Sequence, residues 1–142
     1  MSALPDPFRR TVLHVDGDEA ERQAVARVLS RAGYRVLSAA DGAGALRALE
    51  ERPDLVILDV RLPDTTGFEL CRHIRGTPGT AALPIAFLSS SFFADEDQRY
   101  AASLGADVFL TRPVQATLLV EMVERLTATR STQGRPVPSA AG

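Results

Sequence analysis

The chain has 142 residues, 45% of them hydrophobic and 24% charged, with a formal net charge of -2, which predicts one globular domain with a single core. A charge balance without a basic excess argues against direct binding of nucleic acid, and the lack of a long apolar run argues against a membrane protein. Cys71 is the only cysteine, which excludes a disulfide within the chain, and residues 1–10 lack the apolar core of a signal peptide, so we expect a cytoplasmic location.

The first strand is expected to follow a loose N-terminal arm. Residues 1–10 contain two prolines and two arginines without periodicity, which predicts a flexible segment. Residues 11–16 are mostly apolar and predict a strand that ends in an acidic cluster with Asp16 and Asp18. Apolar residues then recur at helical spacing over residues 20–32, with charged residues on the other side of the predicted helix.

The rest of the chain repeats this alternation of strand and helix. Further strands are predicted at residues 35–39, 55–58, 84–89 and 107–111, and further helices at residues 43–51, 68–75, 95–104 and 118–126. The segment 55–58 has no polar residue, which predicts a strand covered on both faces, whereas 35–39 alternates and predicts a strand nearer an edge. Leu46 and Leu118 are expected to face the core of the fold.

Five strands that are each followed by a helix predict an α/β fold with one parallel sheet covered on both faces. We expect a single domain over residues 11–128, of the flavodoxin-like (βα)5 doubly wound type with strand order 2-1-3-4-5. This order makes the first and third strands neighbours, so the acidic residues after them meet at one edge of the sheet. Residues 129–142 are rich in Ser, Thr, Pro, Gly and Ala, which predicts a disordered tail or a linker.

Asp59 is the leading candidate for a functional residue. It stands where the apolar strand 55–58 stops, and ligands of open α/β sheets bind at the carboxyl ends of central strands. A structural role as a helix cap is weaker, because the next predicted helix begins only at residue 68. His14 precedes Asp16 by two residues on the same side of its strand, and we interpret it as a satisfied core histidine more readily than as a metal ligand.

The acidic edge also predicts a divalent cation. Asp16, Asp18 and Asp59 would repel one another if they were drawn together, unless a cation is present. Magnesium commonly binds through one or two carboxylates and a phosphoryl oxygen, which suits this edge. Ser89 and Arg112, at the ends of the fourth and fifth predicted strands, can supply a hydroxyl and a guanidinium to hold a phosphoryl group there.

Four blocks of the sequence resemble the receiver (CheY-like) domain of two-component response regulators, over residues 11–126. The blocks are Val15-Asp16 with the acids that follow, Leu58-Asp59-Val60-Arg61-Leu62-Pro63-Asp64-Thr65-Thr66-Gly67, Leu88-Ser89-Ser90 and Arg112-Pro113. The resemblance implies that Asp59 accepts a phosphoryl group in a phosphorelay, from a histidine kinase, a phosphotransfer protein or a small acyl phosphate. It also implies a signalling domain that switches a protein-binding surface, and not an enzyme.

The resemblance assigns roles around Asp59. Asp16 and Asp59, with the backbone carbonyl of Arg61, would hold Mg²⁺. Ser89 would bind the phosphoryl oxygen as a switch residue, together with Phe109 at the position of the aromatic switch.

The resemblance further implies a cis peptide bond between Arg112 and Pro113. It also implies a possible homodimer through the fourth helix, fifth strand and fifth helix, where the charges Asp97, Arg99, Glu121 and Arg125 would be exposed.

Two positions depart from the family pattern. Receiver domains usually carry a second carboxylate, a direct metal ligand, where this chain has Gly17, and a lysine where it has Arg112. Asp18 is an alternative ligand one residue further on, and Mg²⁺ binding is expected to be weakened. A second hypothesis is therefore a pseudo-receiver that binds a protein without phosphorylation. A hydrolase or phosphatase that uses Asp59 as nucleophile is disfavoured, because Arg61 stands where a second acid is needed.

Overall fold

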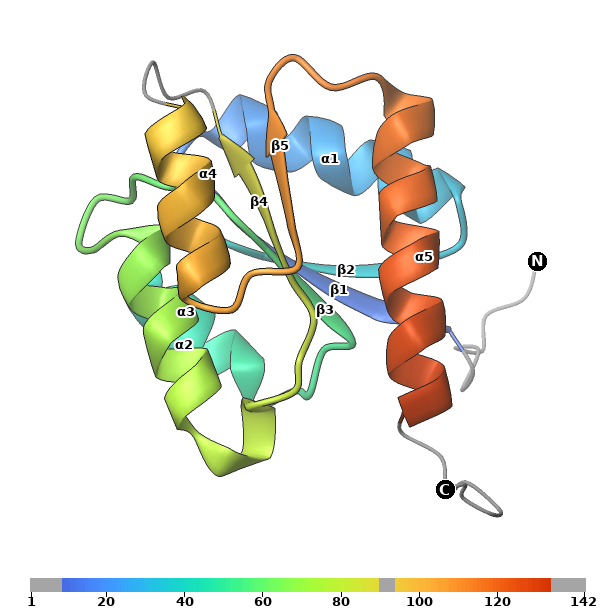
Figure 1. The fold of residues 1–142 in the computed structure, drawn as a ribbon. Helices are drawn as coiled ribbons and strands as arrows, with labels where there is room; N and C mark the ends of the chain where they lie inside the picture. Colours follow the sequence, from blue (N-terminus) through green and yellow to red (C-terminus); the bar gives the residue numbers. More distant parts are fainter. Residues whose placement is uncertain (1–8, 90–93, 134–142) are drawn as a thin grey trace.

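The computed structural model describes residues 9–89 and 94–133, along which strands and helices alternate (Figure 1). The strands are β1 (Thr11–Val15), β2 (Arg35–Ala39), β3 (Leu55–Leu58), β4 (Ile85–Ser89) and β5 (Val108–Thr111). The helices are α1 (Glu19–Arg31), α2 (Gly42–Leu49), α3 (Gly67–Gly76), α4 (Ala94–Ser103) and α5 (Ala116–Gln133), with a 3-10 turn at Pro78–Thr80.

Neighbouring strands are parallel and lie in the order β2-β1-β3-β4-β5, which confirms the predicted topology and the edge position of β2. Val15, the last residue of β1, lies opposite Leu58, the last residue of β3. Ser89 at the end of β4 likewise lies opposite Thr111 at the end of β5. The residues that follow these strands therefore emerge along one edge of the sheet, which we call the rim.

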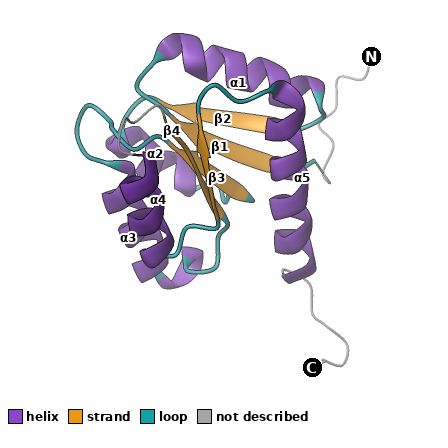
Figure 2. Ribbon diagram, turned by 45° about the horizontal axis from the view of Figure 1, so that its top comes forward, coloured by secondary structure: helices purple, strands orange, loops and turns teal. Residues whose placement is uncertain are grey.

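The sheet has a helical layer on each face (Figures 1 and 2): α1 and α5 cover one face, and α2, α3 and α4 cover the other. Alternate residues of a strand point to opposite faces, so the apolar runs of β1, β3 and β4 supply both cores. The core under α1 and α5 contains Val12, Val25, Leu29, Leu55, Ile57, Ala86, Leu88, Leu119, Met122 and Val123. The core under the other helices contains Leu13, Val15, Val56, Leu58, Leu70, Cys71, Ile74, Ile85, Phe87 and Ala101.

Two leucines predicted to face the core are exposed instead. Leu46 has 41% of its surface exposed and Leu118 has 47%. In each helix the next inward position belongs to a neighbour, Ala45 in α2 and Leu119 in α5, both of which are buried. Because successive helical residues are turned by about 100° from one another, a residue beside the buried stripe points away from the sheet.

The described structure extends a few residues beyond both predicted ends of the domain. The flexible arm was predicted to include Arg9 and Arg10, but Arg9 Nη2 donates to the Tyr34 carbonyl at 3.3 Å and the Arg10 carbonyl accepts from Arg35 N–H at 2.9 Å. The tail was predicted from residue 129, but α5 continues to Gln133 because no glycine or proline interrupts it before residue 134. The rest of the predicted arm and tail lies outside the described residues.

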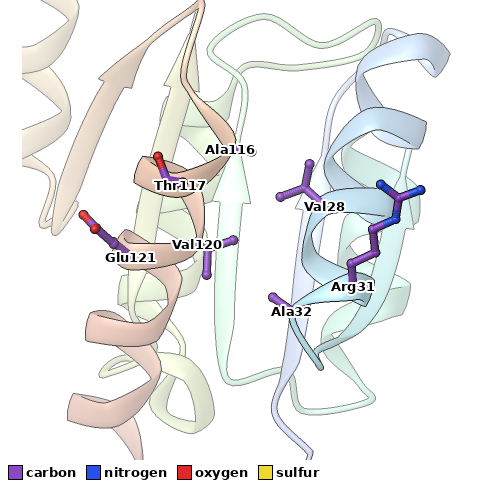
Figure 3. A pocket seen from close by; sticks show the side chains of 7 residues that line it. All are labelled: Val28, Arg31, Ala32, Ala116, Thr117, Val120 and Glu121. Carbon is purple, nitrogen blue, oxygen red and sulfur yellow. The ribbon is translucent and has the colours of Figure 1, made fainter.

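An apolar groove lies between α1 and α5 (Figure 3). It is a hollow of about 490 Å³ into which Val28 of α1 and Val120 of α5 point, whereas Glu121 points to the other side of α5. Val28 and Ala116 also line a second hollow of about 300 Å³ that reaches Arg112. The groove thus continues toward the rim. None of the helices in the described part of the chain combines the length and apolarity that crossing a membrane requires.

Candidate functional site

Three charged side chains meet at the rim, each directly after a strand. Asp16 follows β1, Asp59 follows β3 and Arg112 follows β5. Their side chains are 1%, 17% and 14% exposed, respectively. The predicted strand order brings Asp16 and Asp59 together, because β1 and β3 are neighbours at the centre of the sheet.

The Asp59 carboxylate has one oxygen held by the backbone and one facing a cation. Oδ1 accepts from the Val60 N–H at 2.8 Å, and Oδ2 lies 3.9 Å from Arg112 Nη1. Burial raises the pKa of Asp59 and the Asp16 charge raises it further, while Arg112 opposes both effects. Asp59 is therefore partly buried, oriented and within reach of solvent, as a nucleophilic carboxylate needs to be.

Gly67 sets the shape of the loop after Asp59. Its N–H donates to the Val60 carbonyl at 2.8 Å, and a Cβ at this position would lie 2.2 Å from the backbone oxygen of Asp59. Such an approach excludes every side chain, so the loop can return to the sheet only with glycine here. In the sequence, this contact is indicated by the glycine that closes the loop eight residues after Asp59.

Arg112 contacts three carboxylates. Its Nη2 donates to Asp16 Oδ2, its Nε lies 3.4 Å from Glu21 Oε1, and its Nη1 faces Asp59. The backbone N–H of Arg112 donates to the Ser89 carbonyl at 2.8 Å, which fixes where the side chain begins. The peptide bond between Arg112 and Pro113 is cis.

Asp16 has both carboxylate oxygens engaged. Oδ1 accepts from the Asp18 N–H at 2.9 Å, and Oδ2 accepts from Arg112. Its carbonyl accepts from Arg22 Nη1 at 2.6 Å. Sequence reasoning missed Arg22 and Glu21, because helical periodicity assigns them to the outer side of α1, whereas the first turns of this helix rise directly from the rim.

Asp18 is the N-terminal cap of α1. It is exposed and caps α1, with Oδ1 accepting from the Ala20 N–H at 2.9 Å. An aspartate just before a helix satisfies N–H groups that otherwise lack partners, and this local role turns its carboxylate toward the helix. Asp18 therefore has a helix-capping role in this structure, and its role as an alternative ligand stays a prediction.

His14 is buried as predicted but is not satisfied. It is 0% exposed, its Nε2 lies 3.7 Å from Asp16 Oδ2, and neither ring nitrogen has a hydrogen-bond partner among the described residues. Burial lowers the pKa of His14 to about 4, with Asp16 acting in the opposite direction. The prediction of a satisfied core histidine is wrong in this respect, because the buried ring lies beside Asp16 but too far from it for a hydrogen bond.

The predicted switch residues lie on β4 and β5. Ser89 is buried at the end of β4, at the rim. Phe109 is half-buried and stacks on Phe87, with ring centroids 5.8 Å apart. Arg61 pairs with Thr66 in an isolated antiparallel bridge within the loop after β3. The roles of these residues, including the Arg61 carbonyl as a metal ligand, stay predictions.

The residues at the rim fit Mg²⁺ poorly. The oxygens of Asp16 are engaged, Gly17 has no side chain and Asp18 caps a helix. Over residues 9–89 and 94–133, no three His, Cys, Asp or Glu side chains gather closely enough to hold a metal ion. Asp59 Oδ2 and the Arg61 carbonyl remain as candidate ligands, so a single carboxylate would hold the ion, at the low end of the one or two that Mg²⁺ commonly takes from a protein.

Comparison with known proteins identifies similar domains. A family model described as the response regulator receiver domain matches residues 12–124. The transcriptional regulatory protein GltR of Pseudomonas aeruginosa is 42% identical over 119 residues, which cover 82% of this chain and 48% of GltR. AfsQ1 of Streptomyces coelicolor, also named a transcriptional regulatory protein, is 42% identical over 110 residues, covering 77% of this chain and 47% of AfsQ1.

Solved structures give the same result. The chemotaxis protein CheY4 of Vibrio cholerae matches with a TM-score of 0.77 and 33% identity, over 83% of this chain and 98% of CheY4. The chain spans about half the length of the two curated relatives and nearly all of CheY4.

Proposed function

Because the chain belongs to the response regulator receiver domain family, we propose that it accepts a phosphoryl group on Asp59, from a histidine kinase, a phosphotransfer protein or a small acyl phosphate. The receiver domain is a signalling domain of two-component systems.

The chemistry follows from the two oxygens of Asp59. Oδ2 attacks the phosphorus of the donor, the bond from phosphorus to the donor atom breaks, and the donor leaves with that electron pair. The product is an acyl phosphate on Asp59. The Arg112 guanidinium and the Ser89 hydroxyl would hold the phosphoryl oxygens, because both can donate hydrogen bonds at the rim.

The observation that supports this proposal best is the state of Asp59. It is 17% exposed, has one oxygen fixed by the Val60 N–H and presents the other oxygen toward Arg112. Asp64, by contrast, has both oxygens committed to backbone hydrogen bonds, because it accepts from Gly42 and Ala43.

The test is incubation of the protein with acetyl phosphate, followed by measurement of its intact mass. We expect a mass increase of one phosphoryl group that is lost in Asp59→Asn and kept in Asp95→Asn, a change of an exposed carboxylate on α4. A modification that persists in Asp59→Asn would place the acceptor elsewhere. No modification with acetyl phosphate or with any kinase would remove the proposal.

A pseudo-receiver is the second candidate, and the contact between Arg112 and Asp16 favours it. This pair is almost fully buried, which gives the rim a stable arrangement without a phosphoryl group. In this case a partner would bind the wild-type protein and Asp59→Asn with equal affinity, with or without a phosphoryl donor. A difference in affinity between the two proteins after phosphorylation would exclude this candidate.

Receiver domains generally bind Mg²⁺ in the phosphorylation site. The loss of the carboxylate at Gly17 supports weaker binding here. We also propose a cytoplasmic location, where histidine kinases present their phosphoryl group.

Homodimerisation through α4, β5 and α5 is a further proposal for the switched surface. Arg99 and Glu121 are exposed there, and Glu121 points away from α1 (Figure 3). Light scattering should show a larger mass after phosphorylation, and an unchanged monomer mass would remove this part of the proposal.

A further inference from the structure

We infer that the guanidinium of Arg112 takes the place of the divalent cation at this rim, so that the protein balances the charge of Asp16 and Asp59 itself. If Asp59 is phosphorylated, as proposed above, the reaction then does not require Mg²⁺. The rim residues fit a metal ion poorly, and Arg112 contacts their carboxylates instead.

Arg112 pairs with three carboxylates at the rim. Its three nitrogens address three different carboxylates: Nη2 bonds Asp16, Nε lies 3.4 Å from Glu21 and Nη1 lies 3.9 Å from Asp59. A guanidinium can do this because it is planar and carries donors in several directions, whereas an ammonium is a compact point charge. One side chain thus occupies the position between the carboxylates of β1 and β3.

The charge balance at the rim follows from these pairs. Asp16 and Asp59 contribute two negative charges and the more exposed Glu21 contributes a third, and Arg112 contributes one positive charge that pairs with all three. Arg22 adds a second positive charge, because its Nη1 contacts the Asp16 carbonyl at 2.6 Å. With Asp16 1% exposed and Arg112 14% exposed, solvent screens these charges weakly, so a pairing within the protein matters more than it does on the surface.

The two departures from the family pattern, Gly17 and Arg112, compensate for each other. Gly17 removes a carboxylate from the rim, which lowers the charge that a cation has to balance, and arginine replaces a shorter cation with one that reaches Asp16. A Cβ at Gly17 would lie 3.3 Å from Pro63 Cδ and 3.8 Å from the Ala40 carbonyl. A side chain there therefore needs only a small shift of the proline ring, so the glycine is not required by space.

Arg112 also has the chemistry to assist the transfer. A guanidinium binds phosphoryl oxygens through paired hydrogen bonds, and its Nη1 already faces the attacking oxygen of Asp59. The cation that neutralises the incoming phosphoryl group is thus part of the chain.

The direct test is a magnesium titration followed by thermal denaturation. The proteins are the wild type, Gly17→Ala, Gly17→Asp and Gly17→Asp with Arg112→Lys, each measured with up to about 10 mM MgCl₂ and with NaCl of equal ionic strength. Gly17→Ala is the matched control, because it adds the Cβ without the carboxylate.

We expect no saturable rise of the midpoint for the wild type and Gly17→Ala, and a saturable rise for the double variant. A saturable rise for the wild type equal to that of the double variant would overturn the inference. So would the lack of any rise in the folded double variant, because these two positions would then not be what excludes the ion.

A second measurement separates this inference from the proposed function. The initial rate of phosphorylation of the wild type by acetyl phosphate is compared in MgCl₂ and in EDTA, and we expect a change of less than about two-fold. Phosphorylation only in MgCl₂ would overturn the inference and leave the proposed function intact. If neither condition gives phosphorylation, the proposed function fails, and the magnesium titration alone decides the inference.

Discussion

The ionised carboxylate of Asp59 lowers the stability of the fold. Its pKa is raised by burial and by Asp16 above the ordinary value of 3.8, so the folded state holds the proton more tightly than the unfolded chain. The stability that the protonated Asp59 carboxyl contributes is therefore lost as the pH rises from 3.8 through the pKa of Asp59 in the folded protein. At neutral pH the ionised carboxylate opposes folding.

We accordingly predict that Asp59→Asn raises the melting temperature at pH 7. The amide keeps an oxygen to accept from the Val60 N–H and removes the charge that burial disfavours. Calorimetry of both proteins at a series of pH values should show a gain that shrinks as the pH approaches 3.8. A lower melting temperature for the variant at pH 7 would mean that the ion pair with Arg112 outweighs the burial of the charge.

We predict that His14 lowers the free energy of unfolding in mild acid. Its pKa is about 4 in the folded protein and 6.5 in the unfolded chain, so the unfolded chain binds a proton first as the pH falls. Between pH 7 and pH 5 we expect the free energy of unfolding to fall by about 2 kcal/mol through this residue. His14→Leu should remove this loss in urea denaturation, and an equal loss in both proteins would assign it to other groups.

At the residue scale, the sequence identifies which side chains reach the rim but not how they are used. Asp16, Asp59 and Arg112 could be placed together because they follow neighbouring or nearby parallel strands. The capping role of Asp18 is local and could have been predicted, because aspartate is a preferred residue directly before a helix. The contact of Glu21 with Arg112 could not be predicted, because it depends on the angle at which α1 leaves the rim. That angle is set by packing against the sheet and not by local pattern.

At the scale of elements, Arg75 connects three segments that meet at the end of the sheet opposite the rim. Its guanidinium donates to the Leu83 carbonyl at 2.6 Å and to the Gly105 carbonyl at 2.8 Å, and it pairs with Asp107 at 3.2 Å. The end of α3 is thereby joined to the segments that enter β4 and β5. Helical periodicity predicted only that the helix ends at Arg75. Hydrogen bonds to carbonyls distant in the sequence cannot be predicted from a local pattern.

We predict that Arg75→Ala lowers the free energy of unfolding by about 1–2 kcal/mol, since it leaves the partly buried Leu83 carbonyl without its donor and removes the exposed bonds to Gly105. Arg72→Ala is the matched control on the same helix, because the Arg72 side chain is 56% exposed and is expected to contribute little. Urea denaturation measures both. Equal and small losses would show that water replaces the Arg75 guanidinium.

At the scale of the whole molecule, the alternation of apolar strands with amphipathic helices was sufficient to predict the fold. The five strands, their order and the two helical layers follow from right-handed crossovers onto a parallel sheet. The limits of the domain could not be predicted from composition. Arg10 extends the pairing of β1 with β2 through a backbone hydrogen bond, Arg9 adds a side-chain hydrogen bond to the Tyr34 carbonyl, and α5 continues through polar residues that no glycine or proline interrupts.

The measurement that tests the central claim most directly is the mass of the protein after incubation with acetyl phosphate in the presence of EDTA. The account predicts the gain of one phosphoryl group in the wild type, a bond that hydroxylamine cleaves as expected for an acyl phosphate, and no gain in Asp59→Asn. An unmodified wild-type protein in EDTA that becomes phosphorylated when MgCl₂ is supplied would contradict the role given to Arg112. A phosphoryl group on the Asp59→Asn variant would contradict the role given to Asp59.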